Sequence, residues 1–464
     1  MKRILDELPE SLDETYERVL RSINKTNRDH ALRLLQCVTV AVRPLRVEEL
    51  AEVLAVDFDA ARNGGMPNVK PDWRWSDQHQ AVLSTCSSLI TVVDDGDSQV
   101  VQFSHFSVKE FLTSDRLACS SGDISRYHIL LSPAHTILAQ ACLAVLLRLD
   151  EHIMEYNTSD IPLAGYAARY WVDHTQFEDV SSHIQDVMEY FFDEDRPHWA
   201  AWHRVYDIDD RQWISFTPHS VIRIPTPLYY AALCGFYDLA EHLVIKSPEQ
   251  VNARGGQMVT PLVAALSRGH FRVSDLLHEH GSDLHAPGQW GRTPLHGASS
   301  EGLVDIMRWL LDHGANVNAR SDEGFTPLHL FMVLVRPEIC RILLEHNADI
   351  NTRDNFGKVP LHWAAMGRYV GDAKDMLKTM QLLLDRGADP NVLDDDGCTP
   401  LHDSSGWKKE DYGSICGTVE GAHLLLDHGA NIDAENNEGK TPLQLASEAR
   451  YLEMVEFLSG RGAK

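Results

Sequence analysis

The stretch from Thr293 to Arg320, TPLHGASSEGLVDIMRWLLDHGANVNAR, decides the fold because it specifies two helices and their ends. Thr293 can cap the first helix through its hydroxyl, and Pro294 suits the first helical position, where an N–H would have no partner. Gly302 ends that helix. Apolar residues at helical spacing then form a second helix, which stops at Gly314, a position suited to a left-handed residue. One copy therefore predicts a helix pair followed by an extended turn.

The phrase that opens this stretch occurs seven times in the chain. The copies begin at Thr226, Thr260, Thr293, Thr326, Val359, Thr399 and Thr441. Their starts are spaced by 34, 33, 33, 33, 40 and 42 residues, a fixed period with two insertions. Such a period is typical of a solenoid, because each helix pair has too little apolar surface to bury alone and must stack on its neighbours. We therefore predict a solenoid of seven repeats.

The form TPLH followed by HGANVN resembles the ankyrin repeat, and this resemblance implies a protein-binding array. Four copies keep the complete TPLH, with its histidine at His296, His329, His362 and His402. One histidine per repeat favours hydrogen bonds between successive turns over metal ligation. We therefore expect no metal site and no cofactor.

Composition limits the classes of protein that this chain can belong to. Its 464 residues leave room for about three domains, and a hydrophobic content of 44% is ordinary for folded cores. The formal net charge of −26 disfavours nucleic acids and acidic membrane surfaces as partners, while basic partners stay possible. No apolar run reaches the ~20 residues that a bilayer requires.

Cysteine use and the first ten residues favour a cytoplasmic protein. The eight cysteines form no C-x-x-C pair, which fits reduced thiols better than a disulfide framework or a zinc site. Asp6 and Glu7 stand where a secretion signal would be apolar.

The first part of the chain predicts three helices followed by a hairpin, the pattern of a winged helix. A lead-in helix with an apolar face at Leu12, Tyr16, Val19, Leu20 and Ile23 precedes it, opened by a capping box of Ser11 and Glu14. The winged helix would contain helices at 29–41, 47–56 and 76–86 and strands at 89–93 and 99–103, with the turn at 94–97. A second capping box, Ser107 with Glu110, would open the helix that follows.

Several of these segments resemble a known family. They are LPESLDETYERVL (8–20), RPLRVEELAEVLAV (43–56), CSSLITVV (86–93), VQFSHFSVKEFLTS (101–114) and YAARYWVDH (166–174). They resemble the region that follows the NACHT nucleotide-binding domain in fungal NOD-like (STAND) proteins, and the winged helix named after GPI inositol-deacylase is similar. The resemblance implies the C-terminal part of a signal-transducing ATPase with an ankyrin sensor.

The nucleotide-binding domain of that family is absent from this sequence. A P-loop needs G-x-x-x-x-G-K-[ST], so that backbone amides surround the phosphates and the lysine reaches them. The fragment Gly439-Lys440-Thr441 fails, because Ala434 stands at the first glycine position and the fragment belongs to a repeat turn. We expect no catalytic residue and therefore no enzyme.

His105 is the one candidate for nucleotide contact. It matches the histidine of the motif FxHxSxxEF, which the resemblance implies would touch the ADP phosphate and hold the resting state closed. The alternative is a histidine that bonds only to nearby backbone. We therefore treat His105 as a conditional nucleotide sensor, which acts only where a nucleotide domain presents the phosphate to it.

The expected organisation has four parts. They are a helical lead-in (1–25), a winged-helix domain (26–116), a helical connector (117–220) and the ankyrin repeats (221–464). In the connector we expect helices at 133–149, 163–174 and 182–192. Trp199, Trp202 and Trp213 would seal the first repeat, in preference to forming a ligand pocket.

The partner site is expected on the repeat tips and the adjoining first helices, which line the concave face. Turn tips have no core to fill, and exposed aromatic residues contribute much of the energy of protein interfaces. The candidate partner-binding residues are Trp290, Arg292, Phe325, Phe356, Lys358 and Trp363. The alternative is that each ring only lies against the neighbouring turn.

The whole sequence predicts a protein-recognition module in cytosolic signalling, the regulatory and sensing half of a NOD-like receptor. Self-association within a larger receptor assembly is compatible with it. One alternative is a winged-helix DNA-binding regulator, but residues 1–114 carry 13 Lys and Arg against 18 Asp and Glu, a net charge of −5 (13 − 18). Another is a fragment of a NACHT ATPase switch whose nucleotide domain lies upstream.

Overall fold

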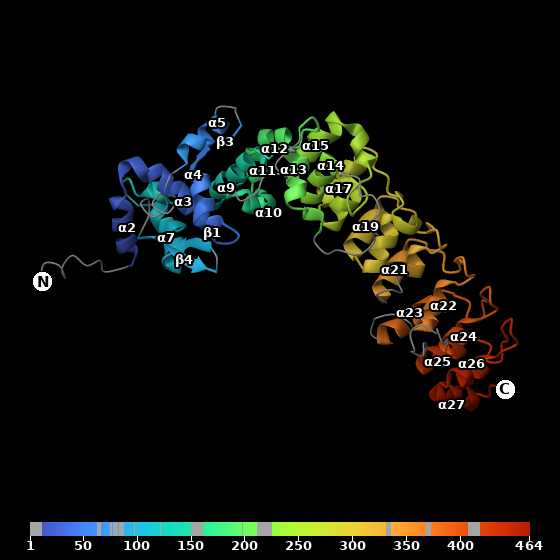
Figure 1. Ribbon diagram of the computed structural model, residues 1–464. Helices are drawn as coiled ribbons and strands as arrows, with labels where there is room; N and C mark the ends of the chain where they lie inside the picture. Colours follow the sequence, from blue (N-terminus) through green and yellow to red (C-terminus); the bar gives the residue numbers. More distant parts are fainter. Residues whose placement is uncertain are drawn as a thin grey trace, which may run out of the picture. The chain divides into compact units, whose positions relative to one another are not determined.

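A computed structural model of the protein describes residues 12–62, 66–74, 77, 82, 88–96, 98–120, 122–149, 161–196, 198–210, 225–330, 336–367, 373–406 and 418–464. The chain forms two compact units, residues 1–215 with 222–257 and residues 258–464 with 216–221. Both units are mainly helical (Figure 1), which confirms the predicted fold class. No helix within the described ranges is both long enough and apolar enough to span a bilayer.

The first unit begins with a helical group. Its helices are α2 (Leu12–Ser22), α3 (Arg28–Val40), α4 (Val47–Leu54) and α5 (Phe58–Arg62), with a single 3-10 turn, η1 (Lys25–Asn27). Tyr16, Leu20 and Ile23 are buried as the periodicity predicted, but Leu12 is 59% exposed and lies off the packed face. The predicted capping residue Ser11 lies outside the described residues.

A small antiparallel sheet follows, and it confirms the predicted hairpin. Strand β4 (Ile90–Asp95) pairs with β5 (Ser98–Phe103), with Ile90 opposite Phe103 and Asp95 opposite Ser98. The turn passes through Gly96, whose φ of 62° favours glycine. The sequence did not predict β1 (Leu45–Arg46), which pairs with the other edge of β5. A second short ladder joins β2 (Val56–Asp57) to β3 (Asn68–Val69), and most of the helix predicted at 76–86 lies outside the described residues.

The connector is helical, as predicted. Its helices are α9 (Leu131–Leu146), α10 (Ala164–Thr175), α11 (Val180–His183), α12 (Gln185–Phe191) and α13 (His198–Val205). Before them, α7 (Phe106–Leu112) lies in the range predicted for the winged helix, and α8 (Asp115–Ala118) crosses the predicted limit at residue 116. Besides η1, the 3-10 turns described between residues 66 and 210 are η2 (Pro71–Trp73), η3 (Ser125–Tyr127) and η6 (Ile208–Asp210). Helix α9 packs against both α3 and α10, so its apolar residues are buried on more than one side.

An aromatic cluster joins the connector to the first helix pair of the repeats, within the same unit. Trp171 and Trp202 are fully buried with ring centroids 5.5 Å apart, and the Trp202 indole N–H donates to Ala168 O at 2.8 Å. Trp171 also contacts Phe236, and Trp202 contacts Tyr230, each at 5.5 Å. Trp202 therefore seals the first repeat, as predicted. Trp213 lies outside the described residues.

The repeats are helix pairs whose first helices each begin at the proline of the recurring phrase. First helices are α14 (Pro227–Cys234), α16 (Pro261–Ser267), α18 (Pro294–Glu301), α20 (Pro327–Leu330), α22 (Pro360–Met366), α24 (Pro400–Ser404) and α26 (Pro442–Ala449). Second helices are α15 (Tyr237–Lys246), α17 (Phe271–Glu279), α19 (Val304–Asp312), α21 (Pro337–Glu345), α23 (Ala373–Asp385), α25 (Val419–Asp427) and α27 (Leu452–Gly460). Turns η7 (Pro248–Asn252) and η8 (Gln289–Gly291) complete the elements. The pair α14 and α15 belongs to the first unit and the later pairs to the second.

In the second unit the helix pairs stack in two layers. First helices contact first helices, as α22 does α24, and second helices contact second helices, as α21 does α23 (Figure 1). Gly302 ends α18, as predicted, with a φ of 70°. Gly314 follows α19 with a φ of 89°, in the left-handed region that the sequence predicted for it.

Candidate protein-binding site

The repeat tips are held by a ladder of backbone hydrogen bonds between neighbouring repeats. Asp322 N–H donates to Trp290 O at 2.9 Å, Asn355 N–H to Glu323 O at 3.1 Å, and Asp395 N–H to Phe356 O at 3.1 Å. The residue before each tip glycine therefore has its backbone fixed while its side chain leaves the turn. The ladder makes the tips a preformed surface, which reduces the entropy lost on binding.

Trp290 and Arg292 form one part of this surface. The Trp290 side chain is 45% exposed, and the Arg292 guanidinium lies over its ring at 4.9 Å. Arg292 also pairs with Glu323 of the next tip at 3.3 Å. Trp290 has a φ of 55°, a strained value for an aromatic residue that persists only where the surroundings impose it. The indole is thus presented on a fixed turn.

Phe325 and Trp363 form a second, half-buried part. Their rings meet edge to face with centroids 5.5 Å apart. The Trp363 indole N–H donates to Asp354 Oδ2 at 2.8 Å, which ties the first helix of one repeat to the base of its own tip. Both rings therefore lie against neighbouring groups, as the alternative interpretation held, while each keeps part of its surface in solvent.

Phe356 extends the exposed surface. Its side chain is 56% exposed, and its backbone N–H donates to Asp354 Oδ1 at 2.8 Å. Trp290 and Phe356 are the two candidate residues whose rings the structure leaves largely in solvent. Exposed aromatic rings are the residue type that contributes most to the energy of protein interfaces, so both rings are candidates for contact with a partner.

Lys358 does not project, contrary to the prediction for its position. Its side chain is only 13% exposed, and its ammonium contacts Asp394 Oδ2 at 2.7 Å and both oxygens of Asp403 at 2.9 and 3.0 Å. Burial raises the pKa of Asp403 to about 7, although the Lys358 ammonium acts to lower it. Burial alone would lower the pKa of Lys358, but the Asp403 and Asp394 carboxylates outweigh that effect and raise it. Lys358 is therefore the cation of a buried ion cluster.

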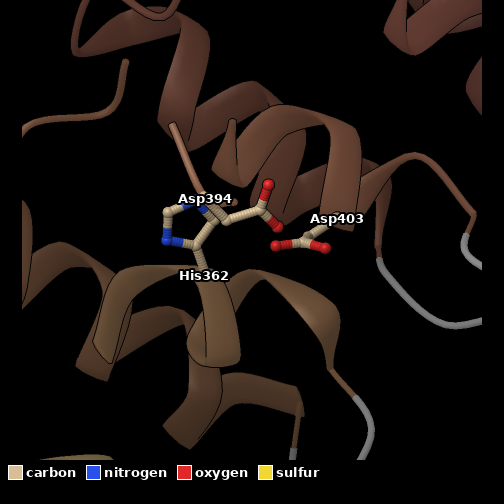
Figure 2. Close-up of side chains that lie close together, drawn as sticks. All are labelled: His362, Asp394 and Asp403. Carbon is tan, nitrogen blue, oxygen red and sulfur yellow. The ribbon is translucent and has the colours of Figure 1, made fainter. Parts of the chain in front are cut away.

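His362 lies beside this cluster, and with Asp394 and Asp403 it resembles a metal-binding set (Figure 2). Its ring nitrogens are already used: Val359 N–H donates to Nδ1 at 3.1 Å, and Nε2 bonds to Cys398 O at 3.1 Å. A carbonyl can only accept, so Nε2 carries the proton and Nδ1 the bonded lone pair. Neither nitrogen has a lone pair for a metal, and Lys358 already supplies the positive charge.

The other TPLH histidines make the same pair of bonds, which confirms the predicted hydrogen bonding between turns. Nδ1 accepts the N–H of the capping Thr293, Thr326 or Thr399, and Nε2 donates to a carbonyl of the next tip, Phe325, Lys358 or Lys440. Burial lowers the pKa of His296, His329 and His362 to about 4. The neutral ring is thus the structural form.

The hydrogen bonds that the structure describes for His105 are local, because both are made to Ser107. Its Nδ1 accepts from Ser107 N–H at 3.3 Å and lies 2.6 Å from the Ser107 hydroxyl, and its ring contacts Phe106. Helix α7 starts at Phe106 with His105 as the capping residue, so the predicted capping box of Ser107 and Glu110 is wrong. These bonds are those of the alternative interpretation, a histidine bonded to nearby backbone.

Sequence reasoning missed the ion cluster at Lys358, although a signal was present. Asp403 occupies the position after the TPLH histidine, where other repeats have Gly297, Leu330 and Trp363. A carboxylate at a position that is otherwise apolar or small needs a cation nearby. Lys358 stands directly after the tip glycine of the repeat before, the position that Arg292 and Phe325 occupy in their own tips.

Comparison with known proteins identifies the array. A model of ankyrin repeats matches in three copies at residues 228–321, 318–374 and 372–464, which together span just over half of the chain. The chain belongs to the ankyrin-repeat family. The three copies do not by themselves fix the number of repeats, because each spans more than one helix pair.

The ankyrin repeats follow a winged helix, as the sequence predicted. A model of the GPI inositol-deacylase winged helix domain matches residues 16–122. Ankyrin repeats are interaction modules without catalytic function, and a winged helix of this type is no sign of catalysis.

Two curated proteins resemble parts of this ankyrin-repeat protein. "Azaphilone pigments biosynthesis cluster protein L" of Monascus ruber is 32% identical over 299 residues, which are 60% of this chain and 61% of that protein. "Alpha-latrocrustotoxin-Lt1a" of Latrodectus tredecimguttatus is 38% identical over 71 residues, 15% of this chain and 5% of the toxin. The matched region thus covers less than two thirds of either relative.

Proposed function

We propose that this ankyrin-repeat protein is the regulatory and sensing half of a NOD-like receptor in cytosolic signalling, and that its tips bind a protein partner. The winged helix followed by ankyrin repeats supports the receptor assignment, together with the sequence motifs at 8–20, 86–93 and 101–114. The domain limits at 25, 116 and 220 are part of this proposal. In it, His105 acts as a nucleotide sensor only if a nucleotide domain is supplied.

The observation that carries the partner site is the exposure of Trp290 and Phe356 on tips whose backbones are fixed. Arg292, Phe325 and Trp363 would form its half-buried surroundings, and Lys358 would hold the turn in shape from beneath. Rigid aromatic side chains lose little conformational entropy on binding, which suits them to be energetic centres of an interface.

The experiment compares binding by variants of the exposed rings. Affinity capture from an extract of the source cells, read by mass spectrometry, is run with the unchanged chain, with Trp290→Ala plus Phe356→Ala, and with Leu452→Ala. Leu452 is a matched control, since it is 76% exposed but lies on the second helix of the last repeat. A partner retained by the control and lost by the tip variant is then purified for calorimetric titration.

We expect the tip variant to keep its melting temperature and to lose ~2 kcal/mol or more of binding free energy, the size of a hot-spot contribution. Equal capture by all three chains would contradict the site. If the tip variant unfolds early, the rings are structural, and the acidic tip at Asp395 and Asp396 becomes the next surface to test.

A further inference from the structure

Two neighbouring tips hold a guanidinium of the chain itself. Trp290 stands directly before a tip glycine, Arg292 directly after it, and Glu323 directly before the next tip glycine. The Arg292 guanidinium lies 4.9 Å from the centre of the Trp290 ring, and its Nη2 donates to Glu323 Oε2 at 3.3 Å. We call these three residues the first tip unit. An aromatic face and a carboxylate are two of the groups that bind a guanidinium well.

The same three positions recur two repeats later at Phe356, Lys358 and Asp396, which we call the second tip unit. Asp395 N–H donates to Phe356 O at 3.1 Å, the counterpart of the bond that Trp290 O accepts in the first tip unit. The tip glycines of the two units have similar φ values of 67° and 72°. The backbone angles at the two rings differ, because Trp290 has a positive φ and Phe356 does not. The two units therefore share their kinds of residue, their place in the repeat and their bonding to the next tip.

The second tip unit differs from the first in the position of its own cation. The Lys358 side chain is 13% exposed, and its ammonium is held by Asp394 at 2.7 Å and by Asp403 at 2.9 Å. The Phe356 ring is 56% exposed, and the Asp396 side chain is exposed as well. No residue in the described part of the chain forms an ion pair with Asp396. The second tip unit thus presents a ring and a carboxylate to solvent, while the lysine of the unit is bound inside the repeat.

A ring beside a carboxylate favours arginine over lysine as its ligand. A guanidinium is planar and weakly hydrated, so it can stack on a ring and donate in its plane to a carboxylate, whereas an ammonium is compact and strongly hydrated. The net charge of −26 also favours a basic partner.

We propose that the second tip unit binds an arginine side chain of the partner protein. The guanidinium lies over the Phe356 ring, as that of Arg292 does over Trp290, and its N–H groups donate to Asp396 and Asp395. This inference rests on the proposed tip site and adds to it the chemistry of the partner.

The probe is a fluorescently labelled, flexible peptide of glycine and serine, ~12 residues long, with arginine at every third position. Two matched peptides carry lysine or the neutral analogue citrulline in place of each arginine. A chain with a net charge of −26 attracts any basic peptide, so the readout is the difference in anisotropy titrations between peptides and between variants of the full chain. We expect the unchanged chain to bind the arginine peptide about threefold more tightly than the lysine peptide, and the citrulline peptide most weakly.

Two variants separate the ring from the carboxylates. Phe356→Leu keeps an apolar side chain without an aromatic face, and it should remove the preference for arginine over lysine. Asp395→Asn plus Asp396→Asn should weaken the binding of both basic peptides by about fivefold or more. Asparagine already occupies the position of Asp395 in two other tips, at Asn355 and Asn437, so the turn accommodates it.

The control for the aspartates removes the same amount of charge from another face. It is Glu453→Gln plus Glu456→Gln, at two exposed residues of α27. It should change the binding of the basic peptides only slightly and keep the preference for arginine, because exposed charges beyond a Debye length are screened. Melting temperatures establish that every variant is folded.

The first tip unit provides an independent test. Arg292→Gln removes the guanidinium that lies on Trp290 and Glu323, so the arginine peptide gains a second site on the same row of tips. We expect its binding to strengthen by about twofold or more. Arg308→Gln is the matched control, because Arg308 is an exposed basic residue on α19 and its loss changes the net charge equally.

Equal binding of the arginine and lysine peptides, or a preference that survives in Phe356→Leu, would overturn the proposal. So would equal binding by the aspartate and control variants, and an effect of Arg292→Gln no larger than that of Arg308→Gln. The tip site itself fails separately, in the capture experiment with Trp290→Ala plus Phe356→Ala. If that variant loses its partner while the arginine peptide shows no preference, the tip site stands and arginine recognition is wrong.

Discussion

Lys358 shows how one residue of a repeat turn can become part of the core. Its ammonium is the cation that the described structure places against Asp394 and Asp403. We expect Lys358→Met to lower the free energy of unfolding by about 3 kcal/mol or more, since it leaves buried carboxylates uncompensated. Chemical denaturation followed by circular dichroism measures this change.

Two controls separate lost charge from lost packing at Lys358. Burial raises the pKa of Asp403 to about 7, so this carboxyl is neutral in the folded protein at pH 5 and becomes charged as the pH rises through 7. The destabilisation by Lys358→Met should therefore be larger at pH 8 than at pH 5. Adding Asp403→Leu should restore part of the loss, because apolar groups often replace a buried pair at little cost. A loss that is equal at both pH values would contradict the role of charge.

The TPLH histidines make stability depend on pH in the opposite sense. Burial holds the pKa of His362 at about 4, below the value of ~6.5 for an unfolded histidine. Its contribution is therefore complete above pH 6.5 and is lost as the pH falls toward 4. We expect His362→Gln to flatten the fall in melting temperature between pH 7 and 5.

The chain itself contains the precedent for this substitution. In the last repeat Gln444 accepts the Thr441 N–H at 3.0 Å, the same bond that His362 accepts from Val359. Stability at pH 7.5 should consequently change by only about 1 kcal/mol, the value of the lost bond from Nε2 to Cys398 O. An unchanged pH profile in the variant would show that other groups govern the acid response.

At the scale of elements, the sequence predicted the helix ends and the hairpin, because residues close together in the chain determine them. Proline and glycine positions gave the starts of the first helices and the end of α18, since those residues restrict or permit backbone angles directly. The hairpin of β4 and β5 followed from alternating apolar residues around a turn. Strand β1 was missed because two residues carry no periodicity, and its pairing with β5 bridges more than fifty positions of sequence.

The candidate site was predictable in part for the same reason. Trp290 and Phe356 each stand directly before a tip glycine, and the spacing of the repeats identifies that position. Their exposure could therefore be predicted from the sequence. The inward turn of Lys358 depends on Asp403, a residue of the next repeat, and no local pattern reports it. The capping role of His105 was assigned to Ser107 because serine is the commoner cap. Contacts between repeats, and caps by unusual residues, therefore need the structure.

At the scale of the whole molecule, the division into two units does not fall between the connector and the repeats. The first helix pair clusters with residues 1–215, where Phe236 and Tyr230 cover Trp171 and Trp202. The Tyr230 hydroxyl also bonds to His203 Nδ1 at 2.6 Å, and Tyr229 donates to Asp209 at 2.6 Å. A fragment that ends before Thr226 loses all of these contacts.

We therefore expect a fragment of residues 1–257 to fold with a near-ultraviolet circular dichroism signal from its buried tryptophans, and a fragment of residues 1–225 to lose much of that signal. Removing two aromatic partners from a buried cluster costs several kcal/mol, because each buries ~150–250 Å². For a domain of this size a loss of about 4 kcal/mol lowers the melting temperature by roughly 10 °C. Phe236→Ala in the longer fragment should give an intermediate value. Equal melting temperatures for the two fragments would show that the first helix pair contributes nothing to the first unit.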